Sequence, residues 1–304
     1  MTKTSTNGEL SEPPPYLTDP VSCGEDLLFN LRAVSGLADK YCGSCDGYHV
    51  LYPAKRLMPF AMIVELDRKE VAATIGKLAG ERLASTQSTF EVVIAGAADT
   101  GLLATAAHSI ALIGAAALSR SRFTVLDRCR TPLELCRHFG QRHGLTVETD
   151  AVDIITDRTS RSADLVIVHS LFRFLPRETH VNVLRKIGRW LRPQGRIVFS
   201  NKLEDKVETR AFETNQRDFG EDILRRIRDG HLRIGESAEA FNARLIHRSI
   251  EQIAGYDSLR SLQALFDLAQ MPVFATQIVR DKVRRSARMI MRHRAIVVLG
   301  APRS

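Results

Sequence analysis

The stretch Phe90-Glu91-Val92-Val93-Ile94-Ala95-Gly96-Ala97-Ala98-Asp99-Thr100-Gly101 decides the fold of this chain. Its first half is an apolar run that predicts a buried strand, and small residues that predict a helix follow the glycine turn at once. Glycine allows the backbone to approach a ligand closely. The first turn of a helix presents backbone N–H groups and a partial positive charge. The stretch therefore predicts a strand–turn–helix unit that can cradle a polar ligand.

Strands and helices continue to alternate from this unit to Ser200. An amphipathic helix is predicted over Glu178–Leu191, and further strands over Phe123–Leu126, Thr146–Thr149, Ala163–Val168 and Arg196–Ser200. Short apolar strands separated by helices indicate a parallel sheet that is buried on both faces. Such sheets bind ligands at the carboxyl ends of their strands. Asp127 follows the second strand and suits ribose hydroxyl groups, so the pattern indicates a nucleotide-type cofactor.

Composition and pattern divide the chain into five predicted segments. We expect a disordered tail over residues 1–22, a helical cap over 23–85, a Rossmann-like cofactor-binding core over 86–201, a helical insertion or lid over 202–257, and completion of the core sheet over 258–304. Two strands are predicted in the last segment, over Val273–Val279 and Ala295–Gly300. Thr100–Ser119 is uncharged but contains His108, and it predicts a buried crossover helix rather than a transmembrane segment.

The positive charge of the chain is concentrated in one place. The formal net charge is +8, and Arg280–Arg294 holds seven Lys or Arg residues with one Asp. Val283, Ala287, Ile290 and Met291 recur at helical spacing, which predicts a helix with a cationic side. A solvated face is the default role, and contacts with phosphates, nucleic acid or a membrane surface stay open. The run has no interleaved aromatic residues, which disfavours a nucleic-acid substrate.

Five cysteines and no apolar leader in the first twenty residues favour reduced thiols and a cytoplasmic protein. Cys42 and Cys45, with His49 and the distant Cys23, have a spacing that zinc could use. Two thiols in a small turn beside a buried helix explain the pattern as well, and we therefore expect no metal.

Taken together, the ordered motifs resemble the class I S-adenosylmethionine-dependent methyltransferases, from Phe90 to Ser200 and over the two closing strands. Five segments carry the resemblance: Gly96–Gly101, Val125–Arg128, Thr149–Ala151, Ala163–Pro176 and Leu184–Phe199. The resemblance implies an α/β, doubly wound sheet of about seven strands, mostly parallel with an antiparallel last strand. It implies S-adenosyl-L-methionine as cofactor and S-adenosyl-L-homocysteine as product. Two departures stand out: Ile94 replaces an expected acid, and Ala98 an expected glycine.

The same resemblance implies a set of site residues. Asp127 is the expected ribose ligand, Asp150 the residue facing the adenine, and Asp99 a substitute for the missing acid. The full cofactor-binding set is Gly96, Ala97, Ala98, Asp99, Gly101, Asp127, Arg128, Asp150, Ala151 and His169. His169 is also the candidate catalytic base, since imidazole titrates in the right range.

Each acid and the histidine also has a purely structural alternative. His169 could only pack, Asp127 could cap the helix that begins near Thr131, Asp99 could cap the helix after Gly101, and Asp150 could be an exposed loop acid.

The function expected from these residues is methyl transfer to an oxygen or nitrogen atom of a small molecule, a carboxylate included. Two alternatives stay open, a degenerate methyltransferase fold that acts as a binding or regulatory protein and an RNA methyltransferase. A nicotinamide-dependent oxidoreductase is disfavoured because Gly-x-Gly-x-x-Gly is absent. The sequence does not specify the oligomeric state.

Overall fold

The computed structural model describes residues 34, 36–38, 40–42, 48–49, 62–203, 255–285 and 288–302, with only the backbone path described for 62–67, 281–285 and 288–292. The predicted tail at residues 1–22 lies outside the described residues, as does nearly all of the predicted insertion at 202–257. Cys23 and Cys45 also lie outside them. Among the described helices, none combines the length and the apolar character needed to cross a membrane.

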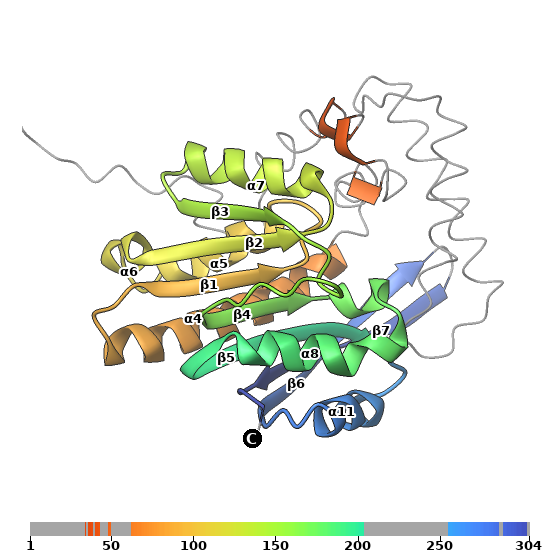
Figure 1. The fold of residues 1–304 in the computed structure, drawn as a ribbon. Coiled ribbons are helices and arrows are strands. Elements are labelled where there is room, and N and C mark those ends of the chain that lie inside the picture. Colours follow the sequence, from red (N-terminus) through yellow and green to blue (C-terminus); the bar gives the residue numbers. More distant parts are fainter. Residues whose placement is uncertain are drawn as a thin grey trace, which may run out of the picture.

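Seven strands form one mixed sheet in the order β3-β2-β1-β4-β5-β7-β6 (Figure 1). The strands are β1 (Phe90–Ala95), β2 (Ser121–Asp127), β3 (Thr146–Ala151), β4 (Ala163–His169), β5 (Leu191–Leu203), β6 (Val273–Arg285) and β7 (Arg288–Leu299). Neighbouring strands from β3 to β5 pair in parallel, and β7 runs antiparallel to both β5 and β6. The predicted fold class, a Rossmann-like sheet with an antiparallel last strand, is confirmed.

Helices cover both faces of the sheet (Figure 1). They are α4 (Met62–Ser85), α5 (Gly101–Ala111), α6 (Ala115–Ser119), α7 (Arg130–Arg142), α8 (His180–Arg189) and α11 (Leu259–Leu268). Val92 and Ile94 of β1 belong to the apolar core shared with α4, α5 and α7, whereas Val93 and Ala95 belong to the core shared with α8 and α11. This alternation follows from the two-residue period of a strand. Both faces of β1 are therefore buried, as its continuous apolar run predicts.

The predicted crossover helix at Thr100–Ser119 is divided in two. α5 ends at Ala111, Gly114 adopts a φ of 149°, and α6 starts at Ala115. Only glycine tolerates this φ without strain, so the chain turns there. Leu112 and Ile113, between the two helices, are exposed.

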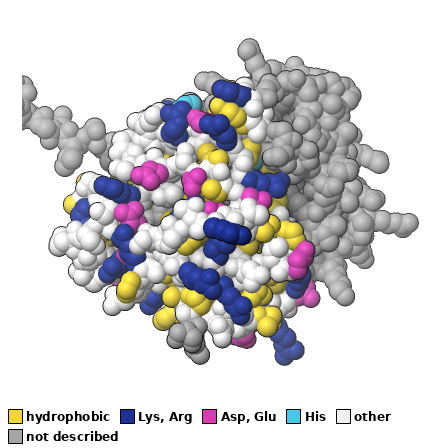
Figure 2. Space-filling view, in the orientation of Figure 1, with side chains coloured by type: hydrophobic (Ala, Val, Ile, Leu, Met, Phe, Trp, Pro, Cys, Tyr) yellow, Lys and Arg dark blue, Asp and Glu magenta, His cyan; other side chains and the backbone are white. Residues whose placement is uncertain are grey.

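The prediction for the basic run Arg280–Arg294 is wrong in its secondary structure. Its backbone forms the arms of the β6–β7 hairpin, which pair from Val273 and Leu299 out to Arg285 and Arg288. Pairing with β5 extends as far as Leu203 opposite His293. Edge-to-edge hydrogen bonding thus overrides the helical spacing of the apolar residues. On the face shown in Figure 2, Lys and Arg side chains are interspersed with Asp and Glu.

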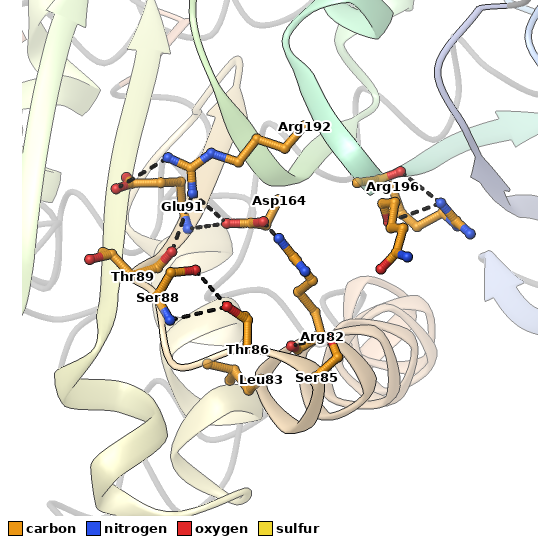
Figure 3. Close-up of polar contacts among 12 residues, drawn as sticks. Arg82, Leu83, Ser85, Thr86, Ser88, Thr89, Glu91, Asp164, Arg192 and Arg196 are labelled. Carbon is orange, nitrogen blue, oxygen red and sulfur yellow. Dashed lines mark hydrogen bonds and ion pairs between the residues drawn. The ribbon is translucent and has the colours of Figure 1, made fainter.

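A compact ion-pair cluster closes the amino-terminal end of the sheet (Figure 3). The buried carboxylate of Asp164, at the start of β4, accepts from Arg82 Nε (2.9 Å), Arg192 Nη1 (2.9 Å) and the Glu91 backbone N–H (3.0 Å). Arg192 also donates to the carbonyl oxygen of Thr89 at 3.2 Å. The cluster joins α4, β1, β4 and β5 at the end of the sheet opposite the predicted site.

Candidate active site

The glycine turn lies at the carboxyl end of β1. Gly96 adopts a φ of 83°, and its N–H donates to the carbonyl oxygen of Leu126 at 2.8 Å. A Cβ at Gly96 would lie 2.9 Å from Leu171 Cδ1, closer than real Cβ contacts allow. Glycine is therefore required here both by the backbone conformation and by the space.

The carboxylate of Asp127 is fixed against this turn. Its Oδ2 accepts from the Ala97 N–H at 3.0 Å, and its Oδ1 accepts from the Cys129 N–H at 2.8 Å. Burial raises the pKa of Asp127 above its usual value of 3.8, and the nearby charge of His49 and the two backbone N–H groups lower it in part. Each carboxylate oxygen retains acceptor capacity beyond its backbone bond. The N-terminal cap of α7 is Cys129, and no side chain caps that helix.

Asp99 has a local structural role. It is buried, and its Oδ1 accepts from the Gly101 N–H at 2.7 Å at the start of α5.

Arg68 of α4 lies against the start of α5, since a Cβ at Gly101 would collide with the Arg68 guanidinium. Arg68 is 3% exposed, and among the described residues its Nε has no hydrogen-bond partner. Sequence reasoning missed Arg68 because it lies in a helix that precedes the sheet and carries no motif.

His169 ends β4 and lies opposite Ser200 of β5. Burial lowers the pKa of His169 well below its usual 6.5, and the charges of Arg294 and Arg68 lower it further. Arg294 reaches the same loop, where its Nη1 donates to Ser170 Oγ at 2.7 Å. The imidazole is therefore neutral near pH 7, and a neutral imidazole can accept a proton.

The remaining predicted residues are more dispersed. Asp150 lies within β3 and forms an ion pair with Arg161 Nη2 at 2.7 Å. It lines a cavity of about 390 Å³ beside the middle of β1, β2 and β3, and this cavity does not include Gly96, Asp127 or His169. Ala151 and Arg128 are exposed, and Ala97 and Ala98 belong to the turn between β1 and α5. The structure therefore brings the glycine turn and Asp127 into direct contact, and places Asp150 in a separate ion pair.

One observation of the site fits a nucleoside cofactor such as S-adenosylmethionine. Beside the Gly96 turn, Asp127 presents a carboxylate whose orientation two backbone N–H groups fix. An acid at this strand end suits the hydroxyl groups of a ribose.

Comparison with known proteins finds one matching family model and solved structures of similar fold. Residues 107–199 match a family model described as a methyltransferase domain. No curated protein matches the chain. Among solved structures, an S-adenosylmethionine-dependent methyltransferase from Methanosarcina mazei is 12% identical, with a TM-score of 0.46 over 72% of this chain and 95% of that chain.

Two further solved structures are similar in fold. The N-methyltransferase NodS from Bradyrhizobium japonicum is 14% identical, with a TM-score of 0.44 over 82% of this chain and 99% of that one. An S-adenosylmethionine-dependent methyltransferase from Leishmania major is 11% identical, with a TM-score of 0.45 over 92% of this chain and 86% of that one. Values below 0.5 support no conclusion about the acceptor.

The matched residues, 107–199, run from α5 to β5 of the Rossmann-like sheet, so this part of the chain is similar to a methyltransferase domain.

Proposed function

We propose that this chain is an S-adenosylmethionine-dependent methyltransferase that transfers the methyl group to an oxygen or nitrogen atom of a small anionic acceptor. The observation that carries the proposal is the junction of Gly96, Ala97 and Asp127, where a hydrogen-bonded carboxylate lies directly against the glycine turn. Asp127 would hold the ribose, and the turn would receive the methionyl part of the cofactor.

When bound, S-adenosylmethionine supplies a methyl group on a sulfonium sulfur that is already a good leaving group. The main task of the chain is then to align the acceptor and to exclude water. Good alignment alone can lower such a barrier by roughly 7–11 kcal/mol. Where the acceptor carries a proton, the neutral imidazole of His169 would remove it. Such general base catalysis raises the reaction rate by about 10²- to 10⁴-fold.

Two arginines beside His169 favour an acceptor that carries negative charge. Arg68 and Arg294 both influence the pKa of His169 through their charges. A carboxylate acceptor would be attracted by both and would need no base. A cationic amine would be repelled by them, so the charges favour a carboxylate or a group next to one.

A matched panel of acceptors tests the proposal. Each carboxylic acid is offered beside its amide with labelled S-adenosylmethionine, and methyl transfer is followed by mass spectrometry. We expect transfer to acids, and we expect Arg294→Gln to raise KM for the acid. The control Arg122→Gln changes an exposed arginine in β2 and should leave KM unchanged. Equal transfer to acids and amides would contradict the anionic acceptor.

A binding or regulatory role is the second candidate, favoured by Ile94 and Ala98 at positions where the family has an acid and a glycine. It predicts cofactor affinity without turnover on any acceptor. An RNA substrate, suggested by the basic β6–β7 hairpin, predicts binding that weakens steeply with added salt. Neither outcome is expected under the main proposal.

A further inference from the structure

Two cysteines and a histidine from distant parts of the chain meet beside Asp127. Cys42 and His49 belong to the described part of the N-terminal segment, and Cys129 lies two residues after Asp127. All three are buried, and one donor atom of each lies within 4.8 Å of the other two. Sequence reasoning considered Cys42 and His49 as metal ligands but missed Cys129, which only the fold brings to them.

The spacing of these donor atoms matches a tetrahedral zinc site. Zn–S bonds of about 2.3 Å and Zn–N bonds of about 2.0–2.1 Å at a tetrahedral angle place two sulfurs about 3.8 Å apart and a sulfur and a nitrogen about 3.6 Å apart. The structure has Cys42 Sγ at 3.7 Å from Cys129 Sγ and at 3.6 Å from His49 Nδ1. Both separations are close to those that a shared zinc ion imposes.

The surroundings suit thiolate ligands. Thr131 Oγ1 lies 3.1 Å from Cys42 Sγ, and its hydroxyl donates to the carbonyl oxygen of Leu37 at 3.3 Å; it can turn from that carbonyl to the sulfur once the sulfur is deprotonated. Such a partner around the ligands is a usual feature of metal sites. The two sulfurs are too far apart for a disulfide, whose S–S bond is about 2.05 Å. Cys136 is also a buried thiol, but its Sγ lies 3.7 Å from the carbonyl oxygen of Asp99 and is not part of the Cys42–His49–Cys129 group.

We propose that Cys42, His49 and Cys129 bind one Zn²⁺ ion, with a water molecule in the fourth position. Binding converts two thiols to thiolates and releases two protons to solvent. The ion would link the N-terminal segment, which holds Cys42 and His49, to the loop after β2, which holds Cys129. The same loop contacts Asp127, because the Cys129 backbone N–H donates to Asp127 Oδ1. The ring of Tyr48, in the same N-terminal segment, packs on the ring of Phe174, which follows β4; the ring centroids are 5.2 Å apart. The zinc site is independent of the proposed acceptor.

Metal analysis of the full-length chain tests the site. Protein purified under reducing conditions, or stripped and reloaded with zinc, should retain about one zinc per chain after gel filtration. Cys129→Ala and Cys42→Ala should lose it, whereas Cys136→Ala, an equally buried thiol, should retain it. Wild-type protein that retains no zinc after reloading would overturn the proposal, as would full retention in both Cys42→Ala and Cys129→Ala.

Cobalt substitution keeps the test decisive if a cysteine variant fails to fold. Co²⁺ added to the stripped wild-type chain should give a thiolate-to-cobalt charge-transfer band and the intense visible bands of tetrahedral cobalt. Stoichiometric zinc should then abolish them, because zinc binds such sites more tightly. Absence of these bands, or octahedral bands only, would overturn the proposal. A Cys42–Cys129 disulfide in protein kept under reducing conditions would do so as well.

Discussion

The two ends of the sheet treat charge in different ways. At the amino-terminal end, Asp164 is neutralised by two arginines, Arg82 and Arg192, so charges pair with each other. At the carboxyl end, the carboxylate of Asp127 accepts from two backbone N–H groups. An acid held by N–H groups retains its negative charge and its orientation, whereas an acid held by arginines is electrically satisfied. The Asp127 carboxylate can therefore bind a ligand, whereas the Asp164 carboxylate stabilises the fold.

The difference implies that mutations at the two ends should separate stability from cofactor binding. Removing Asp164 should affect unfolding and leave binding intact, whereas removing Asp127 should weaken cofactor binding.

Asp164→Ala should have the largest effect, a loss of about 3–5 kcal/mol in the free energy of unfolding. The substitution leaves two arginines and the Glu91 N–H without their shared carboxylate. Urea unfolding measures the loss. In the folded fraction, S-adenosylhomocysteine should bind with unchanged affinity. A weakened affinity comparable to that of an Asp127 variant would remove the distinction between the two ends.

Asp127→Ala should weaken S-adenosylmethionine binding by about 100-fold, or about 2.7 kcal/mol, because charge-assisted hydrogen bonds to the ribose are lost. Isothermal titration calorimetry measures the affinity. Asp157→Ala, an acid paired with Arg161 away from the turn, is the matched control and should retain wild-type affinity. Unchanged binding by Asp127→Ala would show that the ribose lies elsewhere.

Gly96→Ala should cost about 1–2 kcal/mol in stability, because alanine is strained at a φ of 83°. The Cβ would also press on Leu171 and so shift the turn against which Asp127 lies. Gly144→Ala is the control, since Gly144 has a φ of 63° but no atom within 4 Å of its Cβ position. Both variants should lose stability in thermal unfolding, and only Gly96→Ala should also lose cofactor affinity. Equal cofactor affinities of the two variants would indicate that the Gly96 turn does not contact the cofactor.

The pH dependence of stability should show the smallest effect. The pKa of His169 is well below its usual 6.5 in the folded chain, so below about pH 6.5 the unfolded chain binds a proton that the folded chain does not. Stability contributed by the neutral imidazole is present above pH 6.5 and is lost as pH falls, at up to about 1.4 kcal/mol per pH unit. His169→Gln should flatten this decline in urea unfolding between about pH 7 and pH 5.5.

His143→Gln provides the comparison outside the site. Burial lowers the pKa of His143 to about 4, so this variant should also flatten the decline in stability. It should leave turnover unchanged at every pH, whereas His169→Gln should reduce it if the acceptor carries a proton. An equal effect of both variants on turnover would exclude His169 as the base.

Much of the fold can be predicted from the sequence because it depends on local patterns. The apolar run before Gly96 and the acid at Asp127 specify the strand ends that the structure brings into contact. The basic run at Arg280–Arg294 could not be predicted in the same way, since its strand conformation comes from the pairing of β6 with β7, and only His293 and Arg294 of the run also pair with β5. Arg68 and Cys129 were missed for a related reason: each acquires its partners only when separate segments meet.

A crystal structure with S-adenosylhomocysteine tests the central claim most directly. Our account predicts the ribose hydroxyls on the Asp127 carboxylate, the amino-acid part at the turn from Gly96 to Gly101, and the sulfur on the side of His169. Density for the ligand in the cavity lined by Glu148 and Arg161, with Asp127 making no contact to it, would contradict the account.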